Sequence, residues 1–324
     1  MLSNVNLIGQ GEEVTILDAQ GTGGVIRIRD CSNCSLSDIT ITGGLYGVYI
    51  GNSTGGYLEN LIVENNNVSG YGSYSGIGMY YSNEFTLDEI DITNNGATGL
   101  KLYYSSALVK NTIIRGGTGS SSSQWGWFAS INLSHSDATF YNVEIIGNIA
   151  NCYSVGSIYR SDAHFFNVLF GNNPSGDCGG SLDSEALLID THSNPVLTNV
   201  TVSGNHSGLI IRYDSNPLIN NLIHWGNTNP ELFYLWTDSL PNISYSDIEG
   251  GWVEYDSEEY PILEDGNIDQ DPLFTDQSIG DFTLQPGSPC INSGDPNPWY
   301  YEEDNTRSDR GYTGGGRIFP YFNN

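Results

Sequence analysis

CSLSDITITGG, at residues 34–44, decides the fold, because two similar stretches follow: GYLENLIVENN at residues 56–66 and FTLDEIDITNN at residues 85–95. Each opens with alternating apolar residues, reaches Asp, Asn or Glu at its fifth position, alternates again and ends at Gly or Asn. A period of two places every second side chain on one face of a strand. The stretch therefore predicts two short strands joined by one polar residue.

The same pattern recurs along the chain. Its copies begin near Cys34, Gly56, Phe85, Ala107, Ala138, Ala163, Pro195, Pro217 and Pro241. Neighbouring copies begin 22 to 32 residues apart, which is the period of a β-solenoid coil. One coil cannot bury its inner face alone, whereas a stack of about nine forms a continuous core. We predict an all-β solenoid of about nine to ten coils over residues 1–274, with an irregular C-terminal cap at residues 275–324.

The fifth position of each copy predicts a ladder of polar side chains. Its members are Asp38, Asn60, Glu89, Asn111, Asn142, Asn167, Asn199 and Asn221. Stacked coils bring these residues into register, and amide side chains both donate and accept hydrogen bonds. We therefore expect them to bond to one another from coil to coil.

The charge of the chain excludes two classes of partner. Lys and Arg total 10 against 38 Asp and Glu, for a formal net charge of -28. Such a charge repels nucleic acid and anionic membrane surfaces unless cations bridge them, so we expect neither as a partner. No run of about 18 apolar residues occurs, so we expect no membrane insertion.

Phrases near the two ends carry a family resemblance. GQG at residues 9–11 and TILD at residues 15–18 precede the repeats, and DPLF at residues 271–274 and LQPGSPCIN at residues 284–292 follow them. With the repeats, these phrases make nearly the whole chain resemble the pectate-lyase-like superfamily, in particular bacterial secreted and surface proteins. The resemblance implies a right-handed parallel β-helix and an extracellular or cell-surface location. It implies no single activity, because this fold hosts lyases, hydrolases, epimerases, adhesins and fibres.

The cysteines predict disulfides. Cys152 and Cys178 lie 14 and 15 residues after the start of their copies, so adjacent coils should bring them together, and a disulfide between them would imply an oxidising compartment. Two buried free thiols are the alternative. Cys31 and Cys34 favour a local turn disulfide over a metal or redox site, because no second pair follows at zinc spacing.

The longest copies predict an aromatic surface. Their surplus residues carry Tyr71 and Tyr74 in one loop and Trp125 and Trp127 in another. Loops on stacked coils should project from one side, where aromatic rings can contact the apolar face of a sugar. Rings that fold back and cover the solenoid are the alternative.

A column of polar side chains should lie beside those loops, on the strand that precedes each copy. Alternation turns outward Lys101, Tyr103, Asn132, Tyr159, Asp190 and Arg212, with His135, Arg160, His192 and Asp214 just beyond. This set holds a dense collection of cations in a chain that has few. Tyr103, Asn132, Tyr159 and His192 are our candidate glycan-binding residues in the column.

The same column offers candidate catalytic residues. The resemblance implies that Lys101, Arg160 or Arg212 could abstract a proton beside a uronate carboxylate or neutralise that carboxylate. Asp190 and Asp214 could instead form the two carboxylates of a glycosidase. The polygalacturonase signatures are absent from the sequence. Cross-coil ion pairs, such as Asp190 with Arg212, are the structural alternative.

A calcium site is a further expectation, in the cap. Asp295, Asp304, Asn305 and Asp309 offer hard oxygen ligands within a short segment. A solvated acidic loop is the alternative, because composition alone does not fix coordination geometry.

Three functions remain open, and the sequence does not decide whether the protein is an enzyme. We favour binding of a polysaccharide or surface glycan, since it needs no catalytic signature. A polysaccharide lyase or glycoside hydrolase is the first alternative. An adhesin stalk or fibre subunit is the second, and it would need end-to-end self-association through ends able to pair with another copy.

Overall fold

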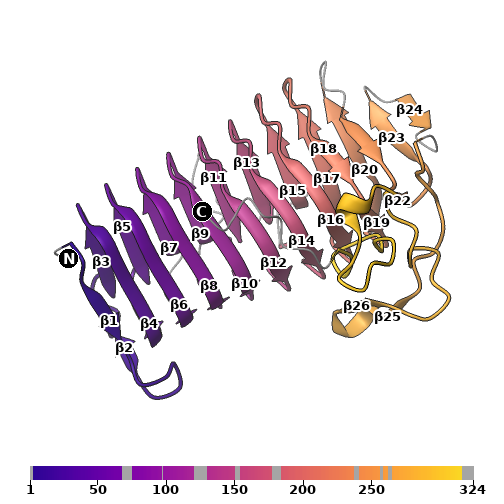
Figure 1. The fold of residues 1–324 in the computed structure, drawn as a ribbon. Coiled ribbons are helices and arrows are strands. Elements are labelled where there is room, and N and C mark those ends of the chain that lie inside the picture. The colour runs from indigo at the N-terminus through magenta and orange to yellow at the C-terminus, as the bar shows by residue number, and fades with distance from the viewer. Residues whose placement is uncertain are drawn as a thin grey trace.

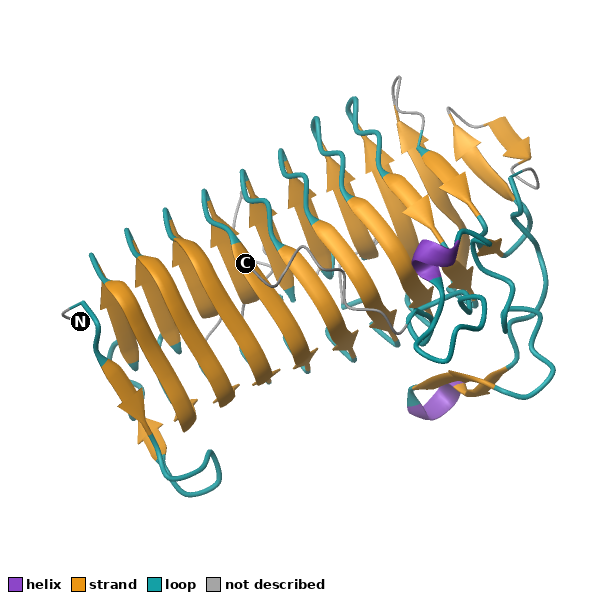
Figure 2. Cartoon of the chain, in the orientation of Figure 1, coloured by secondary structure: helices purple, strands orange, loops and turns teal. Residues whose placement is uncertain are grey.

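The computed structural model describes residues 3–67, 75–96, 98–119, 130–149, 154–176, 184–236, 241–255, 258–261 and 265–315. These residues form a right-handed parallel β-solenoid of about 8 turns, slightly fewer than the expected nine to ten. Two long sheets run side by side along the solenoid, and the cap packs at its C-terminal end (Figures 1 and 2). The predicted fold class is confirmed.

Sheet A is the longer sheet. Its strands are β1 (Asn6–Ile8), β2 (Ile16–Asp18), β4 (Ser32–Thr42), β6 (Thr54–Glu64), β8 (Asn83–Thr93), β10 (Ala107–Arg115), β12 (Thr139–Ile146), β14 (His164–Gly171), β16 (Val196–Ser203), β18 (Leu218–Asn220), β19 (Ile223–Trp225), β21 (Asn242–Ser244) and β22 (Asp247–Ile248). Cys34 pairs with Gly56, Gly56 with Phe85, and Phe85 with Ala107. The repeat starts predicted from the sequence therefore lie in register.

Sheet B carries the second strand of each coil. Its strands are β3 (Ile26–Arg29), β5 (Val48–Gly51), β7 (Ser75–Tyr80), β9 (Thr98–Tyr103), β11 (Ile131–Ser134), β13 (Gly156–Tyr159), β15 (Glu185–Asp190), β17 (Ser207–Arg212), β20 (Asn229–Trp236), β23 (Trp252–Tyr255) and β24 (Glu258–Pro261). All neighbours in this sheet are parallel except β23 and β24, which are antiparallel. The antiparallel strand ends the sheet at the cap.

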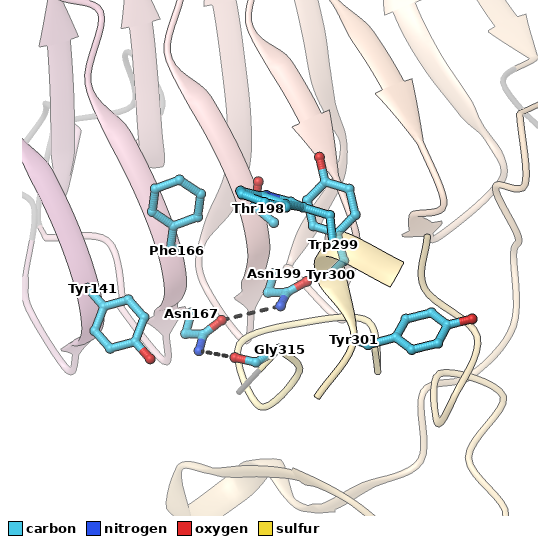
Figure 3. Close-up of a pocket in the computed structure, with 9 residues that line it drawn as sticks. All are labelled: Tyr141, Phe166, Asn167, Thr198, Asn199, Trp299, Tyr300, Tyr301 and Gly315. Carbon is cyan, nitrogen blue, oxygen red and sulfur yellow. Dashed lines mark hydrogen bonds between the residues drawn. The ribbon is translucent and has the colours of Figure 1, made fainter. Parts of the chain in front are cut away.

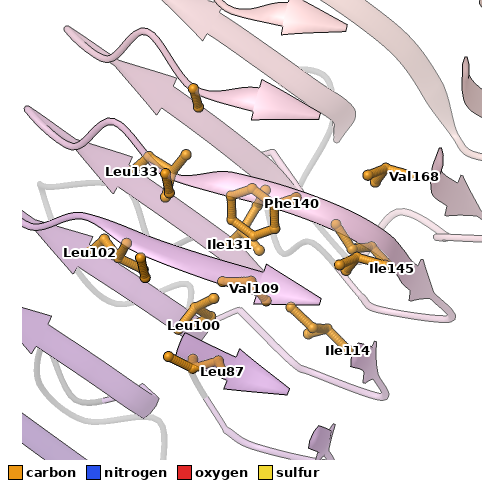
Figure 4. Close-up of a cluster of buried hydrophobic side chains, with 14 of the residues drawn as sticks. Leu87, Leu100, Leu102, Val109, Ile114, Ile131, Leu133, Phe140, Ile145 and Val168 are labelled. Atoms are coloured by element: carbon orange, nitrogen blue, oxygen red, sulfur yellow. The ribbon is translucent and has the colours of Figure 1, made fainter. Parts of the chain in front are cut away.

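The core lies between the two sheets. Leu100 and Leu102 of β9 and Ile131 and Leu133 of β11 are fully buried (Figure 4). The other residues predicted to point inward, Ile158, Ile189, Leu209 and Ile211, are fully buried too. The alternation therefore assigned the inner and outer faces of sheet B correctly.

The predicted polar ladder runs along the bend in the sheet A strands. Asn60 donates to Asp38 at 2.8 Å, and Asn221 donates to Asn199 at 2.8 Å. The intervening bonds of Asn142, Asn167 and Asn199 are 3.2 to 3.4 Å long. Every residue of this ladder has a φ between 48° and 59°, a left-handed conformation that Asn and Asp tolerate best. Glu89 does not accept from Asn111, which donates instead to Asp88.

Two further ladders are buried, and the sequence analysis missed both. One consists of serines in the turns from sheet B to sheet A, namely Ser53, Ser82, Ser105, Ser136, Ser161, Ser193 and Ser215. Each of the first six donates its backbone N–H to the hydroxyl of the next, at 2.9 to 3.2 Å. The other consists of asparagines in the opposite turns, such as Asn148, Asn173, Asn205 and Asn227. Both ladders satisfy backbone groups that the turns would otherwise bury without a partner.

The cap follows the last coils as irregular chain. It contains β25 (Phe274–Asp276), the 3-10 helix η1 (Gln277–Ile279), β26 (Asp281–Leu284) and the 3-10 helix η2 (Pro298–Tyr300). The buried guanidinium of Arg310 donates to the carbonyls of Ser246, Gly266 and Ser293. This side chain therefore fixes the cap to the last turns of the solenoid. The division of the chain after residue 274 stays an interpretation.

The cysteines are only partly described. A disulfide joins Cys31 and Cys34, the local pairing that their spacing favours. Cys152 and Cys178 lie outside the described residues, so a bond between them stays a prediction.

Candidate functional site

The outward face of sheet B holds the column that the sequence predicts. Lys101 lies in register between Gly78 and Asn132, and Tyr103 lies between Tyr80 and Ser134. The side chains of Lys101, Tyr103, Asn132, Tyr159, Asp190 and Arg212 are all half-buried, and their inward neighbours are fully buried. Their outward orientation is confirmed.

A second row of side chains stands in the turns that follow these strands. Tyr81, Tyr104, His135 and Arg160 occupy the first turn position in successive coils, each with a φ of 47° to 52°. Their backbone N–H groups donate to the next coil, for example from Tyr104 to the carbonyl of Ser134 at 3.0 Å. The buried serine ladder comes immediately afterwards and holds each turn in the same conformation. Side chains of successive turns therefore project in register.

The register produces a continuous aromatic stack. The rings of Tyr81 and Tyr104 are parallel within 10° with centroids 5.4 Å apart, and Tyr104 and His135 are parallel within 10° at 4.4 Å. Tyr103 packs edge-on against both tyrosines, and Tyr159 packs edge-on against His135. We call these five residues the tyrosine stack. Tyr81 and Tyr104 remain 55% and 43% exposed, so the stack lies at the surface.

Sequence reasoning placed Tyr103 and Tyr159 in the column and His135 just beyond it, but it missed Tyr81, Tyr104 and the stacking of the rings. A usable signal was present: Tyr-Tyr-Ser at residues 80–82 and again at residues 103–105. Both occurrences lie just before a copy of the repeat.

Cations flank the aromatic rings. The guanidinium of Arg160 lies 5.3 Å from the ring centroid of Tyr159, and the ammonium of Lys101 lies 6.0 Å from that of Tyr80. Arg27 and Arg212 make similar contacts with Tyr49 and Tyr213. With Arg29, this face holds 5 of the 10 lysines and arginines of the chain. The sheet B face is thus rich in cations in a molecule that is otherwise strongly acidic.

Four of the candidate catalytic residues, Arg160, Asp190, Arg212 and Asp214, lie on three adjacent coils, where two pairs of side chains lie close together. Arg212 donates to the Oδ2 atom of Asp190 at 3.0 Å, which is the cross-coil ion pair of the structural alternative. Nδ1 of His192 lies 3.8 Å from Oδ2 of Asp214. Burial lowers the pKa of Lys101.

Distance separates Lys101 from these pairs. Its strand β9 and the strand β17 of Arg212 are four strand positions apart in sheet B, or about 19 Å at the usual strand spacing. The structure therefore brings Asp190 to Arg212 and His192 to Asp214, but it does not gather Lys101 with either pair.

Other candidate residues fall elsewhere. Tyr71, Tyr74, Trp125 and Trp127 lie outside the described residues, so the predicted aromatic surface on the long loops stays a prediction.

The proposed calcium ligands make separate local hydrogen bonds. Asp295 accepts from the backbone of Asn297 at 2.8 Å, and Asp304 accepts from the backbone of Thr306 at 2.9 Å. Asp309 accepts from the backbone of Asn292 at 2.6 Å. No three His, Cys, Asp or Glu side chains gather as metal ligands within the described ranges. Calcium binding through these aspartates and Asn305 stays a prediction.

Comparison of the chain with known protein sequences identifies one family. The sequence profile of the right-handed β-helix region matches residues 23–184. No curated protein sequence matches the chain. No helix within the described part of the chain is both long and apolar enough to cross a membrane.

Solved structures share the architecture at low sequence identity. The pectate lyase Pel9A is 12% identical, with a TM-score of 0.51 over 96% of this chain and 86% of that one. The catalytic domain of an alpha-1,3-glucanase in complex with tetrasaccharides is 13% identical, with a TM-score of 0.37 over 74% and 58%. PfbA, a surface adhesin of Streptococcus pneumoniae, is 12% identical, with a TM-score of 0.37 over 82% and 73%. The profile match, which spans residues 23–184, shows that the chain belongs to the right-handed β-helix family.

Proposed function

We propose that this protein binds polysaccharide along the outward face of sheet B, as a secreted or cell-surface protein. The observation that carries the proposal is the tyrosine stack, an exposed aromatic surface that continues over successive coils. Tyrosine joins an apolar ring to a hydroxyl, which suits a ligand whose rings have apolar faces and polar edges.

The arrangement of the rings favours a polymer over a single sugar. Because Tyr81, Tyr104 and His135 cover one another's faces, the surface that they present to solvent consists largely of ring edges. Those edges recur at each coil, about 4.8 Å apart. A polysaccharide laid along the solenoid axis therefore meets a ring edge at each of three successive coils, at Tyr81, Tyr104 and His135.

The cationic side chains of the sheet B face make acidic glycans candidate ligands as well. Lys101 and Arg160 flank the stack and can attract a carboxylate locally. The rest of the molecule is strongly acidic and repels polyanions at long range. We therefore expect both neutral and uronic-acid polysaccharides as ligands, with the acidic ones sensitive to ionic strength.

The test measures binding and product masses together on a panel of neutral and uronic-acid polysaccharides, with and without calcium. Tyr81→Ala combined with Tyr104→Ala should weaken binding at least about tenfold, because each stacked aromatic contributes on the order of 1 kcal/mol. Ile279→Ala, at an exposed position of the cap, is the control and should bind normally. Equal binding by the double variant and the control would overturn the proposal, and no binding at all would favour a structural stalk.

A polysaccharide lyase is the second candidate, and one observation favours it. Burial lowers the pKa of Lys101, which increases the fraction of neutral amine that can act as a general base. Unsaturated products that disappear in Lys101→Ala would establish this activity. Retention of polysaccharide without products would leave binding as the function.

A further inference from the structure

A groove lies between sheet A and the cap, away from the sheet B face. Tyr141 of β12 and Phe166 of β14 line it on the solenoid side, and Trp299 and Tyr300 of η2 line it on the cap side (Figure 3). It continues into an open cavity of about 490 Å³ that shares Tyr141, Asn167 and Gly315 with it. The sequence analysis did not predict this site, because its two sides come from segments 100 or more residues apart, as Asn199 and Trp299 are.

Hydrogen bonds hold the two sides of the groove in place. The side chain of Asn167 donates to the carbonyl of Gly315 at 2.9 Å, and the backbone of Tyr312 donates to the hydroxyl of Thr201 at 3.0 Å. Gly315 has a φ of 70°, and a Cβ there would lie 2.1 Å from Nδ2 of Asn199. Only glycine permits this approach of the cap to the sheet. The groove is therefore formed before any ligand arrives, which reduces the entropic cost of binding.

Aromatic rings provide the apolar surface of the groove. Trp299 is 48% exposed, whereas Phe166 is 8% exposed and forms the floor. Asn297 caps the 3-10 helix η2, because its side chain accepts from the backbone N–H of Trp299 at 3.1 Å. A partly exposed indole can stack on the apolar face of a sugar ring.

The carboxylates of the open cavity supply hydrogen-bond acceptors beside the hydroxyls of the lining tyrosines and threonines. The amides of Asn142 and Asn167 already donate within the polar ladder and to Gly315. Glu302, Glu303 and Asp304 line the open cavity, and ionised carboxylates only accept. Burial and the negative charge of Glu303 raise the pKa of Tyr141, although a hydrogen bond with Asn142 opposes them.

The charges of the lining residues restrict which class of ligand the groove and cavity can bind. The described residues that line the groove and its cavity include no Lys, Arg or His. An anionic ligand would meet the carboxylates of Glu302, Glu303 and Asp304 without a cationic side chain to compensate them. Sugar hydroxyls, in contrast, can donate hydrogen bonds to these carboxylates.

We propose that the groove and the cavity beside it form a second carbohydrate site, where one ring of an uncharged glycan stacks on the exposed part of Trp299 and the hydroxyls of a neighbouring ring donate to Glu302 and Glu303 in the open cavity. It differs from the sheet B face in position and in charge, and it does not depend on polysaccharide binding there. The two sites would let one molecule hold neutral glycan on one face and acidic or neutral glycan on the other.

The experiment titrates the full chain carrying Tyr81→Ala and Tyr104→Ala, so that any remaining binding arises outside the tyrosine stack. The probes are neutral hexasaccharides of glucose, galactose, xylose and mannose, and the hexasaccharide of galacturonic acid. Calorimetry should show binding of at least one neutral probe and at least tenfold weaker binding of the galacturonic acid probe. Trp299→Ala, added to the same background, should weaken the neutral probe at least tenfold.

Two controls keep the result interpretable. Ile279→Ala removes another exposed apolar side chain of the cap, which is 78% exposed, and it should leave the affinity unchanged. Trp299→Phe keeps an aromatic surface and should restore most of the binding. No binding of any neutral probe, equal binding of the galacturonic acid probe, or unchanged binding in Trp299→Ala would each overturn the second site. None of these results bears on the sheet B face, which the unmutated chain tests separately.

Discussion

Asp247 is fully buried beneath the cap, where its carboxylate meets two donors. Oδ2 accepts from the thiol of Cys290 at 3.0 Å, and Oδ1 accepts from the backbone of Gln270 at 3.1 Å. Burial raises its pKa to about 6, although these hydrogen bonds and the nearby charge of Arg310 oppose the shift. Desolvation therefore outweighs the local partners, and the folded protein binds a proton here more tightly than the unfolded chain does.

The sign of this shift predicts a pH dependence of stability. Because the folded pKa lies above the unfolded value, the stabilising contribution is complete below about pH 4 and is lost as the pH rises through about 6. Asp247→Asn keeps a neutral side chain at every pH. The free energy of unfolding of Asp247→Asn minus that of the unmutated protein should thus increase by on the order of 2 kcal/mol between pH 4 and pH 8. Denaturant unfolding at both pH values measures this difference. Glu59→Gln, at an exposed position of β6, is the control. A difference between Asp247→Asn and the unmutated protein that does not change with pH would refute the prediction.

Glu89 gives a second prediction at the residue scale. It occupies the bend of the polar ladder with a φ of 53°, where six of the other seven positions carry Asn. A left-handed conformation costs Glu about 1 kcal/mol more than Asn. Glu89→Asn should therefore stabilise the protein by about 0.5 to 1 kcal/mol, measured by denaturant unfolding. Glu59→Asn lies in ordinary strand conformation and should not stabilise, so a gain in both variants would show that the bend is not the cause.

The serine ladder is the element that aligns the turns after sheet B. Ser136 accepts from the backbone N–H of Ser105 at 3.1 Å and donates to the carbonyl of Ser134 at 2.9 Å. Both serines of the ladder bond are fully or almost fully buried, so water cannot replace a lost partner. The ladder also precedes each copy of the repeat, and it thereby sets the register of the tyrosine stack beside it.

Ser136→Ala should consequently destabilise the protein. It leaves the buried N–H of Ser105 without an acceptor, which costs about 1 to 3 kcal/mol. Ser106→Ala is the matched control, because the hydroxyl of Ser106 donates to Asn83 in an exposed position, and it should cost less than about 0.5 kcal/mol. Thermal and denaturant unfolding of both variants measure the difference. If the two substitutions cost the same, the ladder does not stabilise the turns.

The repeated local pattern explains which features of the fold and of the candidate site could be predicted from the sequence. The period of two along residues 34–44 and its recurrence predicted the coils, their register and the inward side chains, because those depend on local alternation. The same alternation placed Lys101 and Tyr103 on the outer face. It could not place Trp299 in the same groove as Tyr141, because the irregular cap has no repeating pattern from which the path of the chain could be predicted. It offered the pair of Asp190 with Arg212 as one of two alternatives, and the structure shows that pair while placing Lys101 four strands away.

At the scale of the whole molecule, charge is distributed unevenly. The formal net charge is -28, yet the sheet B face gathers Lys101, Arg160 and three further arginines beside its tyrosines. Arg29 and Arg212 pair with Asp30 and Asp190, so an approaching polyanion meets repulsion from the whole molecule at long range and attraction at contact mainly from Arg27, Lys101 and Arg160. Ionic strength separates the two effects, because screening removes long-range interactions first.

Binding of a uronic-acid polysaccharide should consequently depend on salt in two directions. The Debye length falls from about 30 Å at 0.01 M to about 8 Å at 0.15 M and about 3 Å at 1 M salt. The first change screens the overall repulsion and should strengthen binding about threefold or more, whereas the second also screens the contact cations and should weaken it. Affinity measured by calorimetry across this range should pass through a maximum, and a neutral polysaccharide should show no such maximum. In Arg160→Gln the maximum should be lower, because a local cation is lost while the net charge changes little. A steady fall of uronate affinity from the lowest salt would instead mean that the local cations outweigh the charge of the whole molecule at every distance.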